Sequence, residues 1–262
     1  LVYLSALFTP GDAQPVRAGI RWRVFEERAQ ADGSHKLVMQ SDEAAPFFAL
    51  PDGAYIVHAA FGLAGVTRRI VVNGQTTNER LALNAGGLSI IDVLGSTQLP
   101  AQKLQIQIYV PDRNGSEAKL IFANAKPKEV LGLPEGNYRI ISTLLDTTGI
   151  SGQTSTGNTT NSVVSADLRV QAGRVTEATL RHRAATMTLK LVNAAGGEAL
   201  ANTTFSVLTP GGDSIRELIG AFPSLVLAEG EYVAIARHDG KTFQTTFKVQ
   251  STLDRDVEVI AN

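Results

Sequence analysis

One short pattern occurs three times along this chain and sets the strongest limit on its fold. It reads LPDGAYIV at residues 50–57, LPEGNYRI at 133–140 and LAEGEYVA at 227–234. The copies lie 83 and 94 residues apart, close to the length of one small β domain. We therefore expect three tandem domains of one kind rather than a single large core.

A second shared spacing follows the Tyr of each copy. The segments RIVVNGQTTNERLAL, LRVQAGRVTEATLRH and FKVQSTLDRDVEVIA align, and the alignment pairs two sets of residues: Val71, Val170 and Val249, then ten positions later Leu81, Leu180 and Val259. The distances from Tyr to Val are 16, 32 and 17 residues, so the middle copy has about 16 additional residues. We assign these to a polar insert at 147–163 and expect it to be an extended or mobile hairpin tip.

Alternating apolar residues indicate strands with one buried face. The pattern is clear in GIRWRVF (19–25), KLQIQIYV (103–110) and TTFSVLT (203–209). Gly, Pro, Asn and Asp separate such runs. Long runs with helical periodicity are missing. The sequence therefore predicts an all-β chain of three tandem immunoglobulin-like or transthyretin-like antiparallel β-sandwich domains, at residues 1–86, 87–184 and 185–262.

The recurring pattern itself is typical of a tyrosine corner. We expect Gly53, Gly136 and Gly230 to supply a positive φ in a turn. The following Tyr55, Tyr138 and Tyr232 would begin a strand with a buried ring and a hydroxyl that bonds back to the turn. The acidic residues Asp52, Glu135 and Glu229 occupy a turn position that favours polar side chains, so we interpret them as turn residues rather than ligands or acids.

These motifs resemble the transthyretin-like or carboxypeptidase-regulatory-like sandwich family, which includes the CnaB-type (prealbumin-like) repeats of surface proteins. The resemblance extends over nearly the whole chain as three copies. It implies non-catalytic modules of envelope, secreted or surface proteins. Some CnaB modules form a Lys–Asn isopeptide bond; here Lys190 and Asn262 are the only displaced pair that we can suggest, and we predict an uncross-linked chain.

Composition narrows the function further. The 24 basic and 25 acidic residues give a net charge of −1, which argues against a nucleic-acid partner. There is no cysteine, so disulfides and thiol chemistry are excluded. No stretch approaches the roughly 20 apolar residues of a membrane-spanning helix.

Motifs for chemistry are absent from the sequence. His35, His58, His182 and His238 are widely separated and fit surface side chains better than metal ligands, and Ser116 to Lys119 only superficially resembles a lysine-activated serine. Asp254 and Asp256 are expected on an exposed strand face. We expect no catalytic residues, no metal and no cofactor.

The leading interpretation is a non-enzymatic, extracytoplasmic bacterial protein, periplasmic, cell-surface or secreted, that serves as scaffold, spacer or adhesion module. The expected partner is another envelope or surface protein, or a polysaccharide, and the insert offers candidate contact residues: Thr147, Ile150, Gln153, Asn158 and Asn161. One alternative is a carbohydrate-binding or ancillary module of a larger envelope enzyme, which requires exposed aromatic side chains; Trp22, the only Trp, alternates with core residues. The other is a hydrolase with a site at a module junction.

Overall fold

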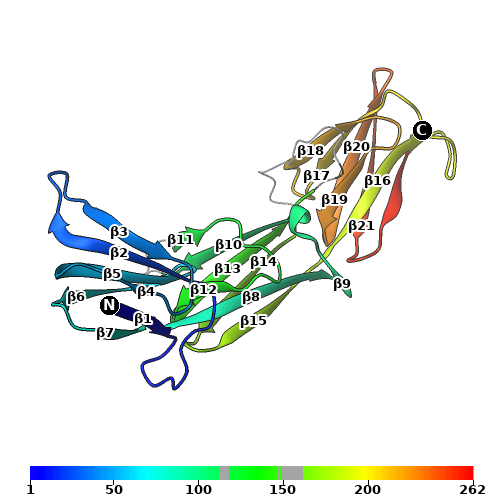
Figure 1. Ribbon diagram of the computed structural model, residues 1–262. Coiled ribbons are helices and arrows are strands. Elements are labelled where there is room, and N and C mark those ends of the chain that lie inside the picture. The colour runs from blue at the N-terminus through cyan, green and yellow to red at the C-terminus, as the bar shows by residue number, and fades with distance from the viewer. Residues whose placement is uncertain (112–117, 147, 149–161, 262) are drawn as a thin grey trace.

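The computed structural model describes residues 1–111, 118–146, 148 and 162–261. Their strands form six sheets that group into three pairs, and the pairs follow one another along an elongated molecule (Figure 1). Each pair stacks two sheets around its own hydrophobic cluster; the first and last sandwiches combine three and four strands, and the middle one combines four and four because β9 adds to its smaller sheet. The chain is therefore all-β with sandwich architecture, as predicted. We call the three units the first, middle and last sandwich.

The first sandwich is built from seven strands, with sheet orders β4-β1-β7 and β3-β2-β5-β6. Its core contains Trp22, fully buried between the two sheets. The strands are β1 (Val2–Leu7), β2 (Ile20–Ala29), β3 (His35–Ser41), β4 (Phe47–Phe48), β5 (Gly53–Phe61), β6 (Ala64–Val72) and β7 (Thr77–Ala82).

The middle sandwich has the orders β12-β8-β15 and β11-β10-β13-β14, with β9 paired to β8. A short 3-10 helix, η1 (Ala101–Lys103), precedes β10. The strands are β8 (Ala85–Leu94), β9 (Thr97–Gln98), β10 (Leu104–Val110), β11 (Lys119–Phe122), β12 (Leu131–Pro134), β13 (Gly136–Leu144), β14 (Val163–Val170) and β15 (Val175–His182).

The last sandwich has the orders β19-β16-β22 and β18-β17-β20-β21. Its strands are β16 (Ala184–Val192), β17 (Thr204–Leu208), β18 (Ser214–Ile219), β19 (Ser224–Ala228), β20 (Gly230–His238), β21 (Lys241–Val249) and β22 (Arg255–Ile260).

The first and last strand of each sandwich pair in parallel, while every other ladder in these sheets is antiparallel. The parallel pairs are β1 with β7, β8 with β15, and β16 with β22. This closure brings both ends of each repeat to one sheet. Consequently, each sandwich ends where the next begins. Only Leu83 and Asn84 separate β7 from β8, and only Arg183 separates β15 from β16. The predicted domain divisions after residues 86 and 184 lie close to these linkers and stay predictions.

The ladders correct one predicted alignment. Gly53 pairs with Val72, just as Gly136 pairs with Val170 and Gly230 with Val249. Val72 is buried, whereas Val71 is 52% exposed. The first-sandwich equivalent of Val170 and Val249 is therefore Val72, because the alternation of a strand turns every second side chain outward.

Candidate functional site

The three recurring tyrosines lie at the same place in the three sandwiches. Tyr55, Tyr138 and Tyr232 are each the third residue of a central strand, β5, β13 or β20, and each is at most 7% exposed. Their hydroxyls donate to the carbonyl oxygens of Pro51 (3.0 Å), Pro134 (2.7 Å) and Ala228 (2.7 Å) respectively. Burial raises the pKa of Tyr138 and of Tyr232. Each ring thus joins the core to the turn four residues upstream.

Two of the three corner glycines lack the predicted positive φ. Gly136 and Gly230 have no positive φ, and Gly53, at φ 159°, is close to extended. All three are the first residues of their strands. A Cβ added there would meet the Tyr ring two residues later at 3.6 to 3.9 Å, an ordinary contact. Neither backbone strain nor a clash therefore demands glycine at Gly136 or Gly230.

The acidic residues of two corners hold the linkers. The backbone N–H of Glu135 donates to the Asn84 carbonyl oxygen (2.9 Å), and that of Glu229 donates to the Arg183 carbonyl oxygen (3.0 Å). The residue after each of these carbonyls is also bonded. The carbonyl oxygen of Ala85 accepts the N–H of Gly173 (2.9 Å), and the carbonyl oxygen of Ala184 accepts the N–H of Thr252 (2.9 Å). Each linker is thus fixed to the corner of the sandwich that follows it.

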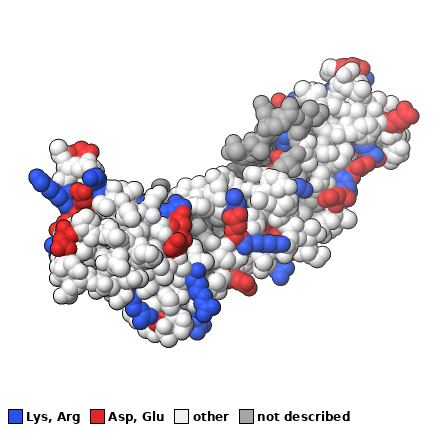
Figure 2. Space-filling view, viewed as in Figure 1, with Lys and Arg blue, Asp and Glu red and all other residues white. Residues whose placement is uncertain are grey.

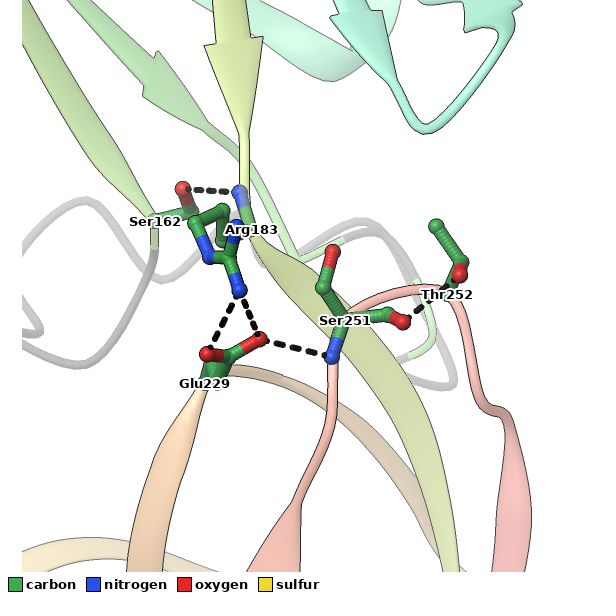
Figure 3. A network of polar contacts seen from close by, with 5 residues as sticks. All are labelled: Ser162, Arg183, Glu229, Ser251 and Thr252. Carbon is green, nitrogen blue, oxygen red and sulfur yellow. Dashed lines mark hydrogen bonds and ion pairs between the residues drawn. The ribbon is translucent and has the colours of Figure 1, made fainter.

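The linker Arg183 is bonded on both sides (Figure 3). Its guanidinium donates to both carboxylate oxygens of Glu229 (2.8 and 3.0 Å), and its backbone N–H donates to Ser162 Oγ (3.2 Å) in the middle sandwich. Glu229 also accepts the N–H of Ser251 (3.0 Å). The hydrogen bonds from Arg183 and then Ser251 hold the pKa of the Glu229 carboxyl below its usual range.

Ser162 also belongs to a buried polar cluster in the middle sandwich. We name it the His182 cluster: Asp92, Ser142, Ser162 and His182. His182 Nε2 lies 3.2 Å from Asp92 Oδ1 and 3.2 Å from Ser142 Oγ, and Nδ1 lies 3.0 Å from Ser162 Oγ. All four residues are at most 6% exposed. The prediction that His182 is a surface side chain is wrong, because its partners approach from three other segments of the fold.

The hydrogen bonds assign a tautomer to this histidine. Ser162 Oγ accepts the N–H of Arg183, so its own proton is available to His182 Nδ1. The Nε2 proton then points to Asp92, with Ser142 beside it. Asp, His and Ser are also the components of a hydrolytic triad, but in this cluster no side chain faces solvent, and the carboxylate shares one ring nitrogen with a serine. The arrangement suits a structural bond network.

A second buried carboxylate crosses from the middle to the last sandwich. Asp146, only 4% exposed, forms an ion pair with Arg216 of β18 and accepts the N–H of Val226 (3.1 Å) in β19. Asp146 also accepts the Thr148 N–H (3.0 Å), and the Thr148 hydroxyl donates to the Ser224 carbonyl oxygen (2.8 Å). Polar contacts from the middle and the last sandwich therefore meet at this joint.

The joint between the first and middle sandwiches is made by an aromatic ring and backbone groups instead. Phe61 of the first sandwich lies against Gly132 of the middle sandwich, where an added Cβ would overlap its ring. Phe8 packs edge to face on Phe61 within the first sandwich, with ring centroids 5.1 Å apart. The Leu63 N–H donates to the Gly132 carbonyl oxygen (2.8 Å). Gly62, at φ 58°, lies so close that a Cβ would overlap the Gly132 backbone.

The remaining predicted residues fall outside these contacts. Thr147, Ile150, Gln153, Asn158 and Asn161 lie outside the described residues, as do Ser116 and Asn262. The predicted insert also included Ser162, which is buried, so its hairpin-tip assignment is wrong at that end. Lys190 bonds Asp256 and Glu258, each at 3.1 Å, and these carboxylates raise its pKa. Asp254 and Asp256 are both exposed, as expected, but only Asp256 lies on the strand, since β22 begins at Arg255.

The other three histidines are separate from one another. His35 is exposed, His58 is half-buried, and His238 is half-buried beside Asp239 (3.3 Å). Burial lowers the pKa of His58, so the prediction that it faces solvent is only partly right. Within the described ranges no three His, Asp or Glu side chains are grouped as a metal site would require. The same ranges contain no helix that is long and apolar enough to cross a membrane.

In the comparison with known proteins, one family model matches part of the chain. Residues 186–261, which form most of the last sandwich, match the model of the Rhizobiales growth-associated tandem repeat domain. No curated protein matches the chain.

Several solved structures are similar to this chain at low sequence identity. The Bacillus anthracis TIE protein is 17% identical with a TM-score of 0.28; the match covers 100% of this chain and 50% of that one. This chain thus spans half the length of that protein. A streptococcal ancillary pilin is 12% identical with a TM-score of 0.31, covering 100% of this chain and 98% of that one. A putative polysaccharide binding protein from Bacteroides thetaiotaomicron is 10% identical with a TM-score of 0.34, covering 63% and 80%.

Proposed function

We propose that this chain is a non-enzymatic scaffold or spacer that holds tandem sandwiches in a fixed order outside the cytoplasm, at the surface or in the periplasm of a bacterium. The observation that carries the proposal is the joint between the middle and last sandwiches. One residue separates their strands, and that residue is bonded to both. A spacer needs such joints, because flexible linkers would let the units tumble independently.

The contacts across this joint supply the stiffness. Asp146 is buried against the last sandwich and has three partners: Arg216 and Val226 in the last sandwich, and Thr148 two residues along its own segment. A rotation of the last sandwich would separate the buried carboxylate from Arg216 and Val226, so the charge-assisted network favours one arrangement. We infer that the two sandwiches keep a single relative orientation.

The alternative of a hydrolase at a module junction depends on the His182 cluster. A serine nucleophile needs an approach path for substrate and a base placed between it and an orienting group. Ser142 and His182 have side chains with almost no exposed area. We therefore propose that the cluster orders the joint and takes no part in bond cleavage.

The sandwich subtype and the partner belong to the same proposal. We favour the transthyretin-like or CnaB-type repeat, divided at the two linkers into three domains. A scaffold of this kind presents its faces to another envelope protein or to a polysaccharide. Figure 2 shows Lys and Arg close to Asp and Glu along the visible face, without one dominant sign of charge.

Small-angle X-ray scattering of the full chain tests the spacer role. The wild-type profile should fit one elongated arrangement of three sandwiches. Asp146→Ala should broaden the pair-distance distribution, because it removes the ion pair to Arg216 and the acceptor for Val226. Asp167→Ala is the matched control, since Asp167 pairs with Arg139 on the exposed surface of the middle sandwich.

The two outcomes separate clearly. A wild-type profile that fits only an ensemble of independently moving units would contradict the proposal. An equal change in both variants would show that the effect comes from loss of charge rather than from the joint.

A further inference from the structure

Two aromatic rings lie side by side on the outside of the first sandwich. Tyr3 of β1 and Phe47 of β4 are direct neighbours across the ladder, with ring centroids 5.7 Å apart and an interplanar angle of 31°. They are 42% and 61% exposed. Aromatic rings are normally among the most valuable core residues, so a pair left in solvent on a regular sheet requires an explanation.

Polar side chains border this pair on the same sheet face. Asn78 of β7 stands directly beside Tyr3 in the parallel ladder, and Ser5 stands beside Arg80. Asn78 and Arg80 are exposed, and the side chain of Arg80 has no hydrogen-bond or ion-pair partner among the described residues. The face thus combines two ring surfaces with an amide, a hydroxyl and a free guanidinium. We name it the Tyr3 face: Tyr3, Ser5, Phe47, Asn78 and Arg80.

The other two sandwiches do not carry these rings. The parallel ladders place Ser89 and Thr188 where the first sandwich has Tyr3. Opposite Thr188 stands Ser224, in the place of Phe47, and the two hydroxyls bond each other at 2.8 Å. The sandwich architecture therefore does not require an aromatic pair at this position.

We propose that the Tyr3 face binds a polysaccharide chain. The C–H faces of pyranose rings stack on aromatic rings, while amide, hydroxyl and guanidinium groups bond sugar hydroxyls or carboxylates. The rings lie on an open sheet face rather than in a pocket, which suits an extended polymer better than a single sugar. A protein partner would need a larger apolar centre than two rings flanked by polar groups. The proposal is independent of the spacer role.

Affinity electrophoresis of the full chain tests this. Native gels would contain hydroxyethyl cellulose as a neutral polymer or polygalacturonate as an acidic one. At least one polymer should retard the wild-type chain. The variant Tyr3→Thr with Phe47→Ser, which copies the pair of the last sandwich, should bind about tenfold more weakly or worse, because both stacking surfaces are lost.

Further variants separate the contributions. Tyr3→Phe should keep binding because the ring remains. Arg80→Gln should weaken retardation by polygalacturonate more than by the neutral polymer if the carboxylate is bound. The control is Phe222→Ser, because Phe222 is 62% exposed on the last sandwich and lies outside the Tyr3 face.

Several results would overturn the proposal. The first is that neither polymer retards the wild-type chain, and the second is that Phe222→Ser loses as much retardation as the double variant. The third is that the wild-type chain self-associates in size-exclusion chromatography and the double variant does not. The last result would assign the face to a second copy of this chain. The thermal midpoint of each variant, expected to match wild type, verifies folding; a double variant that fails to fold would contradict the argument that the rings are dispensable for stability.

Discussion

The middle sandwich differs from its two neighbours at three core positions. Where it has Asp92, the ladders place Ala6 in the first sandwich and Leu191 in the last. Where it has His182, the neighbours have Leu83 and Ala261, and four residues after the corner Tyr, Ser142 replaces Ala59 and Ala236. One architecture thus accepts either an apolar or a polar set at the same end of the core.

This difference coincides with the character of the joints. The end of the first sandwich is apolar, and its joint is made by Phe61, on which Phe8 packs, and by a close approach of the Gly62 and Gly132 backbones. The end of the middle sandwich is polar, and its joint depends on Ser162, Arg183 and Asp146. A buried polar group is unfavourable unless it is paired, and in the His182 cluster His182 pairs with Asp92 Oδ1, whereas Asp92 Oδ2 has no hydrogen-bond partner among the described residues. The comparison indicates that the polarity of the core at one end of a sandwich matches the polarity of the contacts with the next sandwich.

The largest expected effect concerns what all three sandwiches share. Replacing Tyr55, Tyr138 or Tyr232 with Ala should lower the free energy of unfolding by about 3 to 5 kcal/mol, because each substitution leaves a ring-sized cavity. Replacement with Phe removes only the hydrogen bond to the turn and should cost about 1 kcal/mol. Chemical denaturation measures both, and unchanged midpoints in the three Ala variants would contradict the shared corner.

The next effect concerns what only the middle sandwich has. His182→Ala should destabilise it by about 3 kcal/mol, because Asp92 is left buried without its donor. The triple variant Asp92→Leu, Ser142→Ala and His182→Ala copies the residues of the last sandwich and should recover most of this loss.

The same denaturation series verifies that rescue. If the triple variant is less stable than His182→Ala alone, the three positions are not interchangeable between sandwiches and the comparison fails.

A smaller effect is expected from the insert. The first and last sandwiches close the equivalent connection with two residues, Gly62 and Leu63 or Asp239 and Gly240. Replacing residues 149–161 with two glycines keeps Thr148 and Ser162 in place. The thermal midpoint should stay within a few degrees, since loop length contributes weakly to stability. As a comparison, extending the deletion through Ser162 should be clearly destabilising; equal midpoints for both deletions would refute the role of Ser162.

The smallest effect is a pH dependence at the linker. The pKa of Glu229 in the folded chain is lowered, first by Arg183 and then by the Ser251 N–H. Its contribution is therefore present above the ordinary pKa of Glu, 4.5, and is lost as the pH falls through the lowered folded value. The difference in thermal midpoint between wild type and Glu229→Gln should shrink on acidification. A difference that grows in acid would have the wrong sign.

The sequence was sufficient for the local features of the fold. Ile20, Trp22 and Val24 alternate and are buried as predicted, and the spacing of the three tyrosines identified their shared place. These features depend on neighbours within a few residues, so a period of two and a turn motif reveal them. Tyr3 alternates out of phase with Val2 and Leu4, and that signal would have identified it as outward-facing.

Long-range partners were not predictable in the same way. His182 and Asp92 are 90 residues apart, and the parallel pairing of β8 with β15 brings them together. No local pattern carries that information, so His182 was assigned to the surface. The Val71 error has a related cause, because a difference of one residue in spacing reverses which side chain faces the core.

Pulsed electron paramagnetic resonance between the middle and last sandwiches tests the central claim, that the polar core of the middle sandwich orders the joint. The chain has no cysteine, so spin labels on Asn137→Cys and Thr246→Cys, both exposed, report one distance. We predict a single narrow distribution for the otherwise wild-type chain and a broader one when Asp92→Leu, Ser142→Ala and His182→Ala are added, because Ser162 then loses its bond to His182. A distribution that stays equally narrow in that folded variant would contradict the account.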